Sequence, residues 1–356
     1  MKRHVARALA VVVGVTAIGA LVLTPATLVA QSKAKAENVP EIPITSVPDF
    51  FKLPPDLYFG EGIGIATNSK GHVFVYTRSG DTRVLEFDQN GNYVKEIGAG
   101  LYGLEFAHTI RVDKDDNIWV VDEGTNMVIK FSPDGNRVLM VLGRRPEPVV
   151  GAFETALPAA PPEKYRFGRP TDVTWDAQGN IFVSDGYVNS RVVKYDKNGR
   201  FIKSVGTRGS APSQLNTPHS ITSDAQGNIY VGDRGNARVQ VFDNDLILRA
   251  IYDNVGNPWA VCVSPPPNQY LFVSNSYPDS SPAAARDITG EVYKMELNGK
   301  IVGKFGRAGK KLGEFSSIHE IDCRNPDQLF VVEISAWRAQ KILLNQKPAT
   351  TTAGQR

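Results

Sequence analysis

The sequence has little cysteine, little excess charge and almost no long apolar runs. Only two of its 356 residues are cysteines, too few for the disulfide framework that holds small secreted domains together. Apolar residues still make up 42%, enough for the core of one large domain or two ordinary ones. The 32 glycines and 23 prolines favour many tight turns over long helices.

The one long apolar run lies near the N-terminus. It fills residues 8–23, follows a basic start and precedes small residues that end in an Ala-x-Ala pattern at Ala36. This order predicts a secretory signal peptide over residues 1–36. The run is short for a membrane span, but an uncleaved anchor remains the alternative. We therefore expect a secreted or periplasmic protein, with membrane contact only if the signal stays attached.

Most of the positive charge belongs to this N-terminal segment. The whole chain has a net charge of +3, and removal of residues 1–36 takes away five basic residues and no acidic ones, which leaves −2. The remaining domain has no basic surplus with which to attract a phosphate backbone. We therefore expect no nucleic-acid partner.

Internal repeats dominate the chain after residue 60. A clear copy reads DAQGNIFVSDGYVNSRVVKYDKNGRFIKSVG, with turn residues at fixed offsets between short strands of alternating polarity. This pattern predicts β-hairpins rather than helices. Six copies of roughly 50 residues, each the size of a four-stranded blade, predict an all-β, six-bladed β-propeller over residues 60–346.

The sixth repeat lacks its outer strand. In the N-terminal segment 37–59, Asp49–Leu53 resembles the outer strands of other repeats, and we expect it to complete blade six and join the two ends of the chain. The proline- and alanine-rich insertion Arg144–Lys164 predicts a surface loop, and residues 347–356 predict a disordered tail. Cys262 and Cys323 lie near the starts of first strands in neighbouring repeats, so a disulfide and two buried free thiols are both open.

Three of the five histidines share one position in the repeat. Counting back 14 residues from the end of the second strand in blades two, four and six reaches His108, His219 and His319, whereas the same step reaches Thr171 in blade three and Gly64 in blade one. This position opens the first strand of each blade, which lines the channel of a propeller. Alternate blades of six are a third of a turn apart, so the three imidazoles should converge on the axis.

Three histidines with an open fourth position are typical of a catalytic zinc site. Iron, cobalt or manganese could use the same ligands. The loops after the second strands add Arg78, Arg234 and Tyr187, which should surround one mouth of the channel. Arginines there could bind a carboxylate through two hydrogen bonds. The alternative is that the arginines form structural ion pairs and that Tyr187 is a packing residue.

Two segments, PTDVTWDAQGNIFVSDGYVNSRVVKYD and TPHSITSDAQGNIYVGDRGNARVQVF, carry a resemblance to a known family. The sequence resembles the peptidyl-α-hydroxyglycine α-amidating lyases, which are six-bladed propellers of NHL repeats. The resemblance implies zinc on the three histidines, a catalytic Tyr187 and active-site arginines at Arg78 and Arg234. It also implies a structural calcium ion, with ligands from Glu320 and from backbone carbonyls near Gly62 and Ile110.

The implied reaction is the cleavage of an N-acyl-α-hydroxyglycine, such as a peptide that ends in α-hydroxyglycine, to a primary amide and glyoxylate. Two residues depart from the family pattern: Glu320 replaces an aspartate, which puts calcium in doubt, and Ser317 replaces a methionine of the pocket wall. Three other functions stay open. They are a non-catalytic binding propeller, a lactonase-like hydrolase, and a metal-dependent lyase for another carbinolamide.

Overall fold

The computed structural model describes residues 38–145, 163–277 and 289–344. The predicted signal peptide 1–36, most of the insertion 144–164 and the predicted tail 347–356 lie outside these ranges. Within them no helix has the length and apolar character needed to cross a bilayer. The one helical element among the described residues is a short 3₁₀ turn, η1 (Arg234–Asn236).

The described residues form 24 strands in six four-stranded sheets. Their bounds are β1 (Ile44–Val47), β2 (Gly62–Thr67), β3 (Val73–Thr77), β4 (Arg83–Phe87), β5 (Tyr93–Ile97), β6 (Ala107–Val112), β7 (Ile118–Asp122), β8 (Met127–Phe131), β9 (Val138–Gly143), β10 (Asp172–Trp175), β11 (Ile181–Asp185), β12 (Arg191–Tyr195), β13 (Phe201–Val205), β14 (Pro218–Ser223), β15 (Ile229–Asp233), β16 (Arg238–Phe242), β17 (Leu248–Tyr252), β18 (Pro258–Val263), β19 (Leu271–Asn275), β20 (Glu291–Met295), β21 (Ile301–Phe305), β22 (Ile318–Asn325), β23 (Gln328–Glu333) and β24 (Arg338–Leu344).

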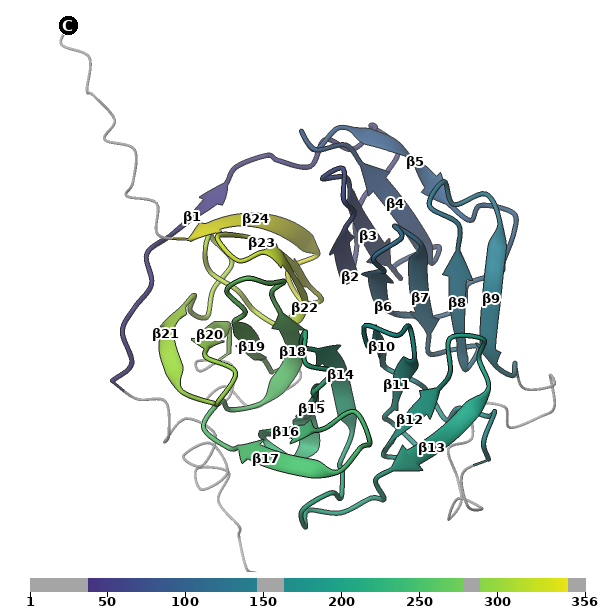
Figure 1. Cartoon of the computed structure of the whole chain (residues 1–356). Coiled ribbons are helices and arrows are strands. Elements are labelled where there is room, and N and C mark those ends of the chain that lie inside the picture. The colour runs from purple at the N-terminus through teal and green to yellow at the C-terminus, as the bar shows by residue number, and fades with distance from the viewer. Residues whose placement is uncertain (1–37, 146–162, 278–288, 345–356) are drawn as a thin grey trace, which may run out of the picture.

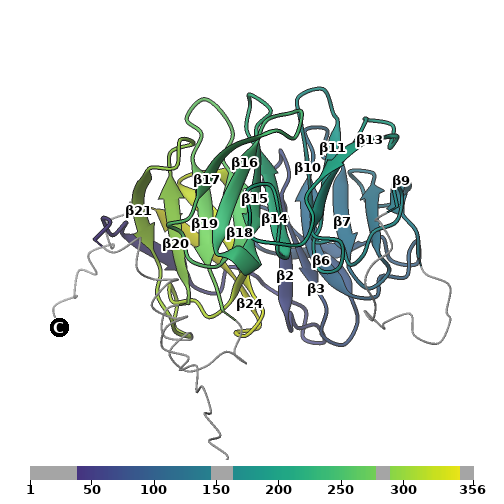
Figure 2. The same ribbon diagram turned by 90° about the horizontal axis from the view of Figure 1, so that it is seen from below.

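The six sheets stand around a central axis as the blades of a propeller (Figure 1). Strands β2, β6, β10, β14, β18 and β22 are the innermost strands of blades one to six, and side views show the sheets standing next to one another around the axis (Figure 2). Every pairing within a blade is antiparallel, as hairpin connections require. The predicted six-bladed all-β fold is therefore confirmed.

The turn between the first two strands of a blade is set by a repeated aspartate. In blade three, Asp176 Oδ1 accepts hydrogen bonds from the backbone N–H groups of Gln178 (3.0 Å) and Asn180 (2.8 Å). Asp113 and Asp224 make the equivalent bonds in blades two and four. The aspartate carboxylate accepts hydrogen bonds from backbone N–H groups that have no partner strand where the chain reverses. This requirement explains the fixed offset of the aspartates in the sequence.

The core is divided among the interfaces between blades. Each of six apolar clusters joins strands of two neighbouring blades. Between blades six and one, for example, Phe330 and Val332 pack with Val75 and Phe87. The second strands, such as β3, β7 and β11, are buried along their whole length, whereas outer strands such as β13 keep exposed positions. The inner part of each blade is therefore held rigidly around the axis.

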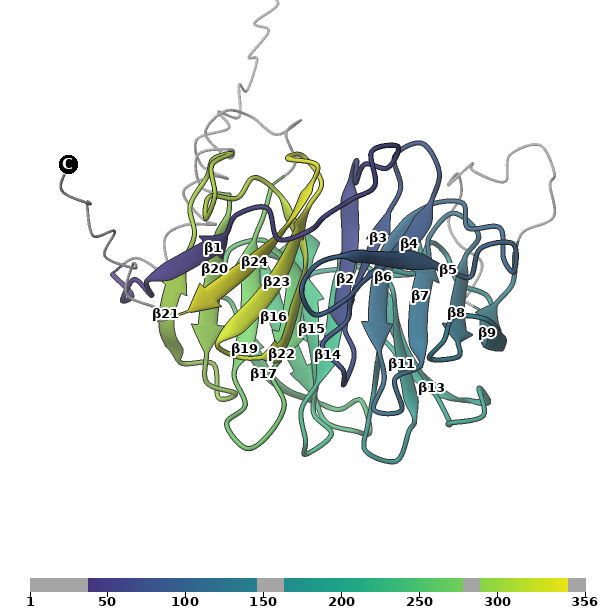
Figure 3. The same ribbon diagram turned by 90° about the horizontal axis from the view of Figure 1, so that it is seen from above.

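The prediction for the closing strand is wrong in its residues. The strand that completes blade six is β1 (Ile44–Val47), which pairs antiparallel with β24 (Figure 3). The predicted segment Asp49–Leu53 follows β1 in the chain, and Phe50 and Phe51 pack with the cluster between blades six and one. Lys52 forms a parallel bridge with Asn92 of blade one, so this segment pairs with blade one and does not complete blade six.

A disulfide joins blades five and six. Cys262 of β18 and Cys323 of β22 are bonded, with their Cα atoms 6.0 Å apart. The bond links two neighbouring inner strands, so it fastens the blade that holds both ends of the propeller to the blade before it. This result decides between the two states that the sequence left open.

Candidate active site

Each of the three histidines is the extra residue of a β-bulge. In blade two, Ala107 pairs with Asp122 and Thr109 pairs with Val121, which leaves His108 unpaired between them. The same break in register falls at His219 in β14 and at His319 in β22. A bulge turns a side chain out of the regular alternation of a strand. Blades one and five break register at the same place, after Gly62 and after Pro258. The bulge is therefore a feature of the repeat, and histidines occupy it in blades two, four and six.

The three imidazoles meet inside the channel. Their potential ligand atoms all lie within 4.8 Å of one another, and all three residues are buried. The ring centroids are 4.6 Å apart for His108 and His219, 4.7 Å for His108 and His319, and 4.8 Å for His219 and His319. The convergence predicted from the repeat is present.

Backbone groups of the intervening blades orient the rings. His219 Nδ1 donates to the carbonyl oxygen of Trp259, and His319 Nδ1 donates to that of Ile63, each at 2.7 Å. His108 is hydrogen-bonded to the backbone of Thr171. Each acceptor belongs to the blade that follows around the ring, so that blade one provides the acceptor for blade six. A ring that donates from Nδ1 keeps the lone pair on Nε2, which is the arrangement found in histidines that bind metals.

The electrostatics of the cluster also suit a cation. Burial lowers the pKa of all three imidazoles well below the usual value, and the positive charge of Arg234 lowers it further. Arg78 adds to this lowering of the pKa at His108 and His319, so the rings are neutral. Among the described residues, Nε2 of His219 is buried without a hydrogen-bond partner. A buried acceptor without a donor is costly, and a metal ion would satisfy it. Three neutral imidazoles around one point therefore fit zinc or a similar divalent ion.

Tyr187 lies directly beside this cluster. Its hydroxyl is 3.3 Å from His108 Nε2, and the guanidinium groups of Arg169 and Arg234 lie 4.6 Å and 5.2 Å from the centre of its ring. Burial raises the pKa of Tyr187, and this effect outweighs the lowering by Arg234 and Arg78. The two arginines alone therefore do not favour the phenolate enough to offset burial.

The two predicted arginines both reach the site but differ in their partners. Arg78 forms an ion pair with Glu61 at 2.7 Å and lies 4.1 Å from the centre of the Phe106 ring. Arg234 lies over Tyr187 and, at 4.9 Å, over the ring of Trp259. Within the described ranges no carboxylate forms an ion pair with Arg234. Arg234 is therefore better placed than Arg78 to receive a carboxylate from outside.

The repeat alignment of blade one needs a correction. Thr77 ends the second strand of blade one, in the place that Asp122 takes in blade two. The histidine position of blade one is therefore Ile63, and the alignment on Arg78, which gave Gly64, is wrong by one residue. Blade one has the bulge at Ile63, but without a histidine at that position the shift of one residue leaves no signal in the sequence.

With the register corrected, Arg78 and Arg234 correspond to Glu123, a residue that the sequence analysis missed. Glu123 is 2% exposed. It forms an ion pair with Arg169, and its other oxygen is 3.9 Å from His108 Nε2. Burial raises the pKa of Glu123, while Arg169 opposes that rise. The signal that could have found it is its position, immediately after the second strand, where blades one and four carry the predicted arginines.

The calcium prediction does not fit the contacts of Glu320. Its Oε2 accepts hydrogen bonds from the backbone N–H groups of Ile65 (3.1 Å) and Ile110 (3.3 Å), and its Oε1 lies 3.0 Å from the guanidinium of Arg111. Oε2 is thus occupied by two donors, whereas Oε1 has no hydrogen-bond partner among the described residues and lies next to the guanidinium charge of Arg111. Gly62, expected to contribute a carbonyl, begins β2 opposite Thr77. No oxygen cage of the kind that calcium requires is formed around Glu320 by the described residues.

The chain is similar in sequence to an NHL repeat and to proteins named for peptide amidation. Residues 215–242, which span β14 to β16, match the NHL repeat. The chain is 31% identical over 287 residues to peptidyl-glycine alpha-amidating monooxygenase B of Xenopus laevis, covering 76% of this chain and 30% of that protein. It is 30% identical over 217 residues to a probable peptidyl-alpha-hydroxyglycine alpha-amidating lyase of Caenorhabditis elegans, covering 54% and 58%. The chain thus spans less than two thirds of these relatives' lengths.

Solved structures support the fold alone. A streptogramin B lyase superposes with a TM-score of 0.53 at 15% identity, covering 85% of this chain and 98% of that one. A gluconolactonase of Xanthomonas campestris gives 0.55 at 16% identity, covering 90% and 93%. The family follows from the sequence relatives and the NHL match: this chain belongs to the peptidyl-α-hydroxyglycine α-amidating lyase family of NHL-repeat β-propellers.

Proposed function

We propose that this chain is a zinc-dependent lyase that splits an N-acyl-α-hydroxyglycine into a primary amide and glyoxylate. The observation that carries the proposal is the buried cluster of His108, His219 and His319 beside Tyr187. These residue types, in these roles, are the ones that the family resemblance implies. The relatives named as amidating enzymes support the same reaction class.

The reaction is an elimination that needs no water. The substrate hydroxyl loses its proton, its oxygen forms a double bond to carbon, and the bond between that carbon and the amide nitrogen breaks. The bonding electrons move to the nitrogen, which takes up a proton. The chain must therefore bind the substrate carboxylate, remove one proton from oxygen and keep the hydroxyl and the base in contact.

The three imidazoles would hold the metal through Nε2, since their Nδ1 atoms are used by the backbone. Zinc bound there would supply positive charge that polarises a substrate oxygen and favours the anionic form of a nearby phenol. Tyr187 then takes the proton from the substrate hydroxyl, because its own hydroxyl lies beside the cluster, 3.3 Å from His108 Nε2. Its ring is held between Arg169 and Arg234.

Arg234 binds the substrate carboxylate that leaves in glyoxylate, since it faces the site without an ion-pair partner among the described residues. Arg78 contributes positive charge to the site, and its ion pair with Glu61 holds it in place. The ion pair of Glu123 with Arg169 keeps Arg169 over the phenol ring.

A related carbinolamide is the second candidate substrate, and a specific observation favours it. Ser317, which replaces the methionine expected in the pocket wall, is fully buried and exchanges a 2.6 Å hydrogen bond with Ser335. A wall with hydroxyl groups would suit a more polar acyl group than an apolar peptide end. Comparison of substrates with apolar and polar acyl groups separates the two candidates.

We also propose that the protein acts outside the cytoplasm. The Cys262–Cys323 disulfide supports this location, because such bonds persist mainly in oxidising compartments. Fractionation of cells that express the full-length chain tests the proposal, and recovery of the protein with reduced cysteines from the cytoplasm would contradict it.

The function is tested by measuring glyoxylate released from a small N-acyl-α-hydroxyglycine by the purified protein and two histidine variants. His219→Ala should lose bound metal and activity together, because it removes one of three ligands. His72→Ala is the matched control, since His72 lies in a turn of blade one, paired with Glu86, and should change neither. Full metal occupancy in His219→Ala would disprove the site, and a folded, metal-loaded protein without glyoxylate release would disprove the reaction.

A further inference from the structure

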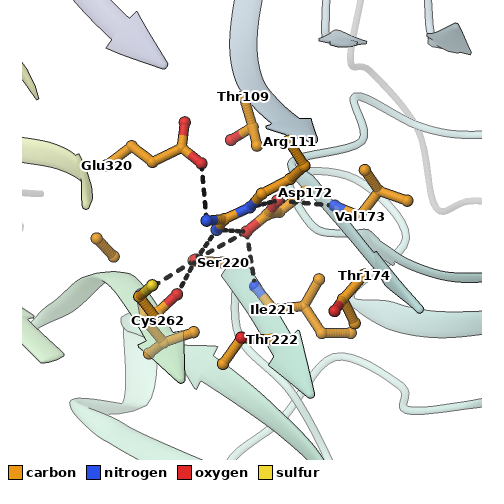
Figure 4. Close-up of polar contacts among 12 residues, drawn as sticks. Thr109, Arg111, Asp172, Val173, Thr174, Ser220, Ile221, Thr222, Cys262 and Glu320 are labelled. Carbon is orange, nitrogen blue, oxygen red and sulfur yellow. Dashed lines mark hydrogen bonds and ion pairs between the residues drawn. The ribbon is translucent and has the colours of Figure 1, made fainter. Parts of the chain in front are cut away.

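A second polar layer crosses the channel next to the histidines. Its centre is Arg111, whose guanidinium lies between two buried carboxylates (Figure 4). The Arg111 Nε and Nη2 atoms donate to Asp172 at 2.9 Å and 2.6 Å, and Nη1 lies 3.0 Å from Glu320 Oε1. Asp172 is fully buried and Glu320 is 1% exposed. The layer is therefore an internal ion cluster, not a surface salt bridge.

This cluster reaches the inner strands of all six blades. Arg111 belongs to β6, Asp172 to β10 and Glu320 to β22. Ser220 of β14 donates to Asp172 at 2.8 Å and accepts from the backbone N–H of Val261 in β18 at 3.1 Å. The N–H of Ile65 in β2 donates to Glu320. One cation thus ties together strands that otherwise meet only at their neighbours.

Both oxygens of Asp172 are already used by donors, and so is Glu320 Oε2. Among the described residues, Glu320 Oε1 has no hydrogen bond but faces the Arg111 guanidinium at 3.0 Å. Asp172 Oδ2 accepts from Arg111, from Ser220 and from the N–H of Ile221 at 2.9 Å, and Oδ1 accepts from Arg111 and from the N–H of Val173 at 2.8 Å. Calcium needs six to eight oxygen ligands, whereas this layer presents N–H groups to its carboxylates.

Arg111 carries the positive charge at this point. Burial alone would lower the pKa of its guanidinium, but Asp172 and Glu320 raise it. A divalent ion placed a few ångströms away would be repelled by the guanidinium, with little water between them to weaken the repulsion. Arg111 and a calcium ion are therefore alternatives for the same two carboxylates.

We propose that the Arg111 guanidinium takes the place of the structural calcium ion expected at Glu320, so that this propeller is held together by its own side chain and needs no calcium. The proposal concerns the scaffold and does not depend on the reaction at the histidines.

Calcium titration tests the proposal directly. The mature, zinc-loaded protein is freed of calcium and then titrated with calcium chloride in a calorimeter, and its thermal unfolding is recorded with and without the ion. We expect no heat of specific binding and no change in Tm. Binding of one calcium ion per chain with a rise in Tm would overturn the proposal, whatever the enzyme's activity.

A variant tests whether Arg111 and calcium are interchangeable. Arg111→Ser leaves two buried carboxylates without their cation, so its Tm should fall by roughly 6–20 °C and should recover when calcium is added. Arg324→Ser is the matched control, because Arg324 is exposed and its guanidinium donates to the Val112 carbonyl oxygen; it should show neither effect. A folded Arg111→Ser protein whose Tm does not change when calcium is added would contradict the proposal that the two cations are interchangeable. If this variant does not fold, the calcium titration of the unmodified protein decides the question.

Discussion

The three histidines of the channel have different sequence neighbours but share one set of contacts. Each is a bulge residue, each is buried, and each has a hydrogen bond to the backbone of the following blade. A neutral ring held at Nδ1 presents Nε2 in a fixed direction. The preorganisation of the metal site therefore comes from the backbone, and single side chains outside the cluster should affect catalysis more than metal binding.

Tyr187 gives a test of this separation. Tyr187→Phe removes the hydroxyl next to His108 but none of the three imidazoles. We expect metal content to be unchanged and kcat to fall by roughly 10²–10⁴-fold, the usual loss for a general base. Metal analysis and glyoxylate release measured on the same sample check this. Tyr165→Phe, at an exposed tyrosine, is the control, and equal turnover in the two variants would remove Tyr187 from the mechanism.

Residue spacing was enough to predict the histidine cluster but not its surroundings. Three histidines at one repeat position carry a strong signal because the type is rare and the position is shared. Glu123 and Arg169 come from neighbouring blades and meet only through the packing of blade two on blade three. Arg111 sits in an ordinary strand, and nothing in the sequence says that its side chain enters the channel with Glu320.

At the level of elements, strand pairing was predicted well within the blades, but the strand that completes blade six was predicted at the wrong residues. The turn aspartates and alternating runs identify the hairpins one by one, whereas β1 and β24 are joined across nearly the whole chain. From the sequence, either Ile44–Val47 or Asp49–Leu53 could form the closing strand. The second segment is instead held by its aromatic rings, since the Phe51 ring centroid lies 5.0 Å from that of Phe87 and 6.1 Å from that of Phe330.

Removal of β1 tests the closure. A protein that begins at Asp49 lacks the strand paired with β24 and the backbone bond from Ile42 to Lys304 in blade five. We expect the free energy of unfolding to fall by about 3–5 kcal/mol, from a lost strand ladder and the burial of Ile44, and the exposed edge of β24 to promote association. Thermal melts and size-exclusion chromatography compare it with a protein that begins at Asn38; equal stability would contradict the assignment of β1.

At the level of the whole molecule, three features hold the ring of blades together. They are the pairing of β1 with β24, the Cys262–Cys323 disulfide and the ion cluster around Arg111. The disulfide and the ion cluster join different blades directly, whereas β1 completes blade six with a strand whose chain continues into blade one. A propeller opens by separating two neighbouring blades, so each feature should raise the stability of the ring without altering the geometry of the histidines.

The disulfide provides the prediction at this scale. It closes a sequence separation of 61 residues, so the double variant Cys262→Ser, Cys323→Ser should lose about 2–4 kcal/mol in free energy of unfolding. Metal content and glyoxylate release at moderate temperature should stay the same. Denaturant unfolding with and without a reducing agent measures the effect, and an unmodified protein that is insensitive to reduction would show that the bond does not stabilise the ring.

The central claim is that a metal held by His108, His219 and His319 makes this propeller a lyase. The most direct measurement is glyoxylate release from an N-acyl-α-hydroxyglycine by metal-stripped protein as zinc is added back. We predict no release from the stripped protein and activity that rises to a plateau at one zinc ion per chain. Release that persists without metal, or a folded protein that takes up one zinc ion and releases no glyoxylate, would contradict the claim.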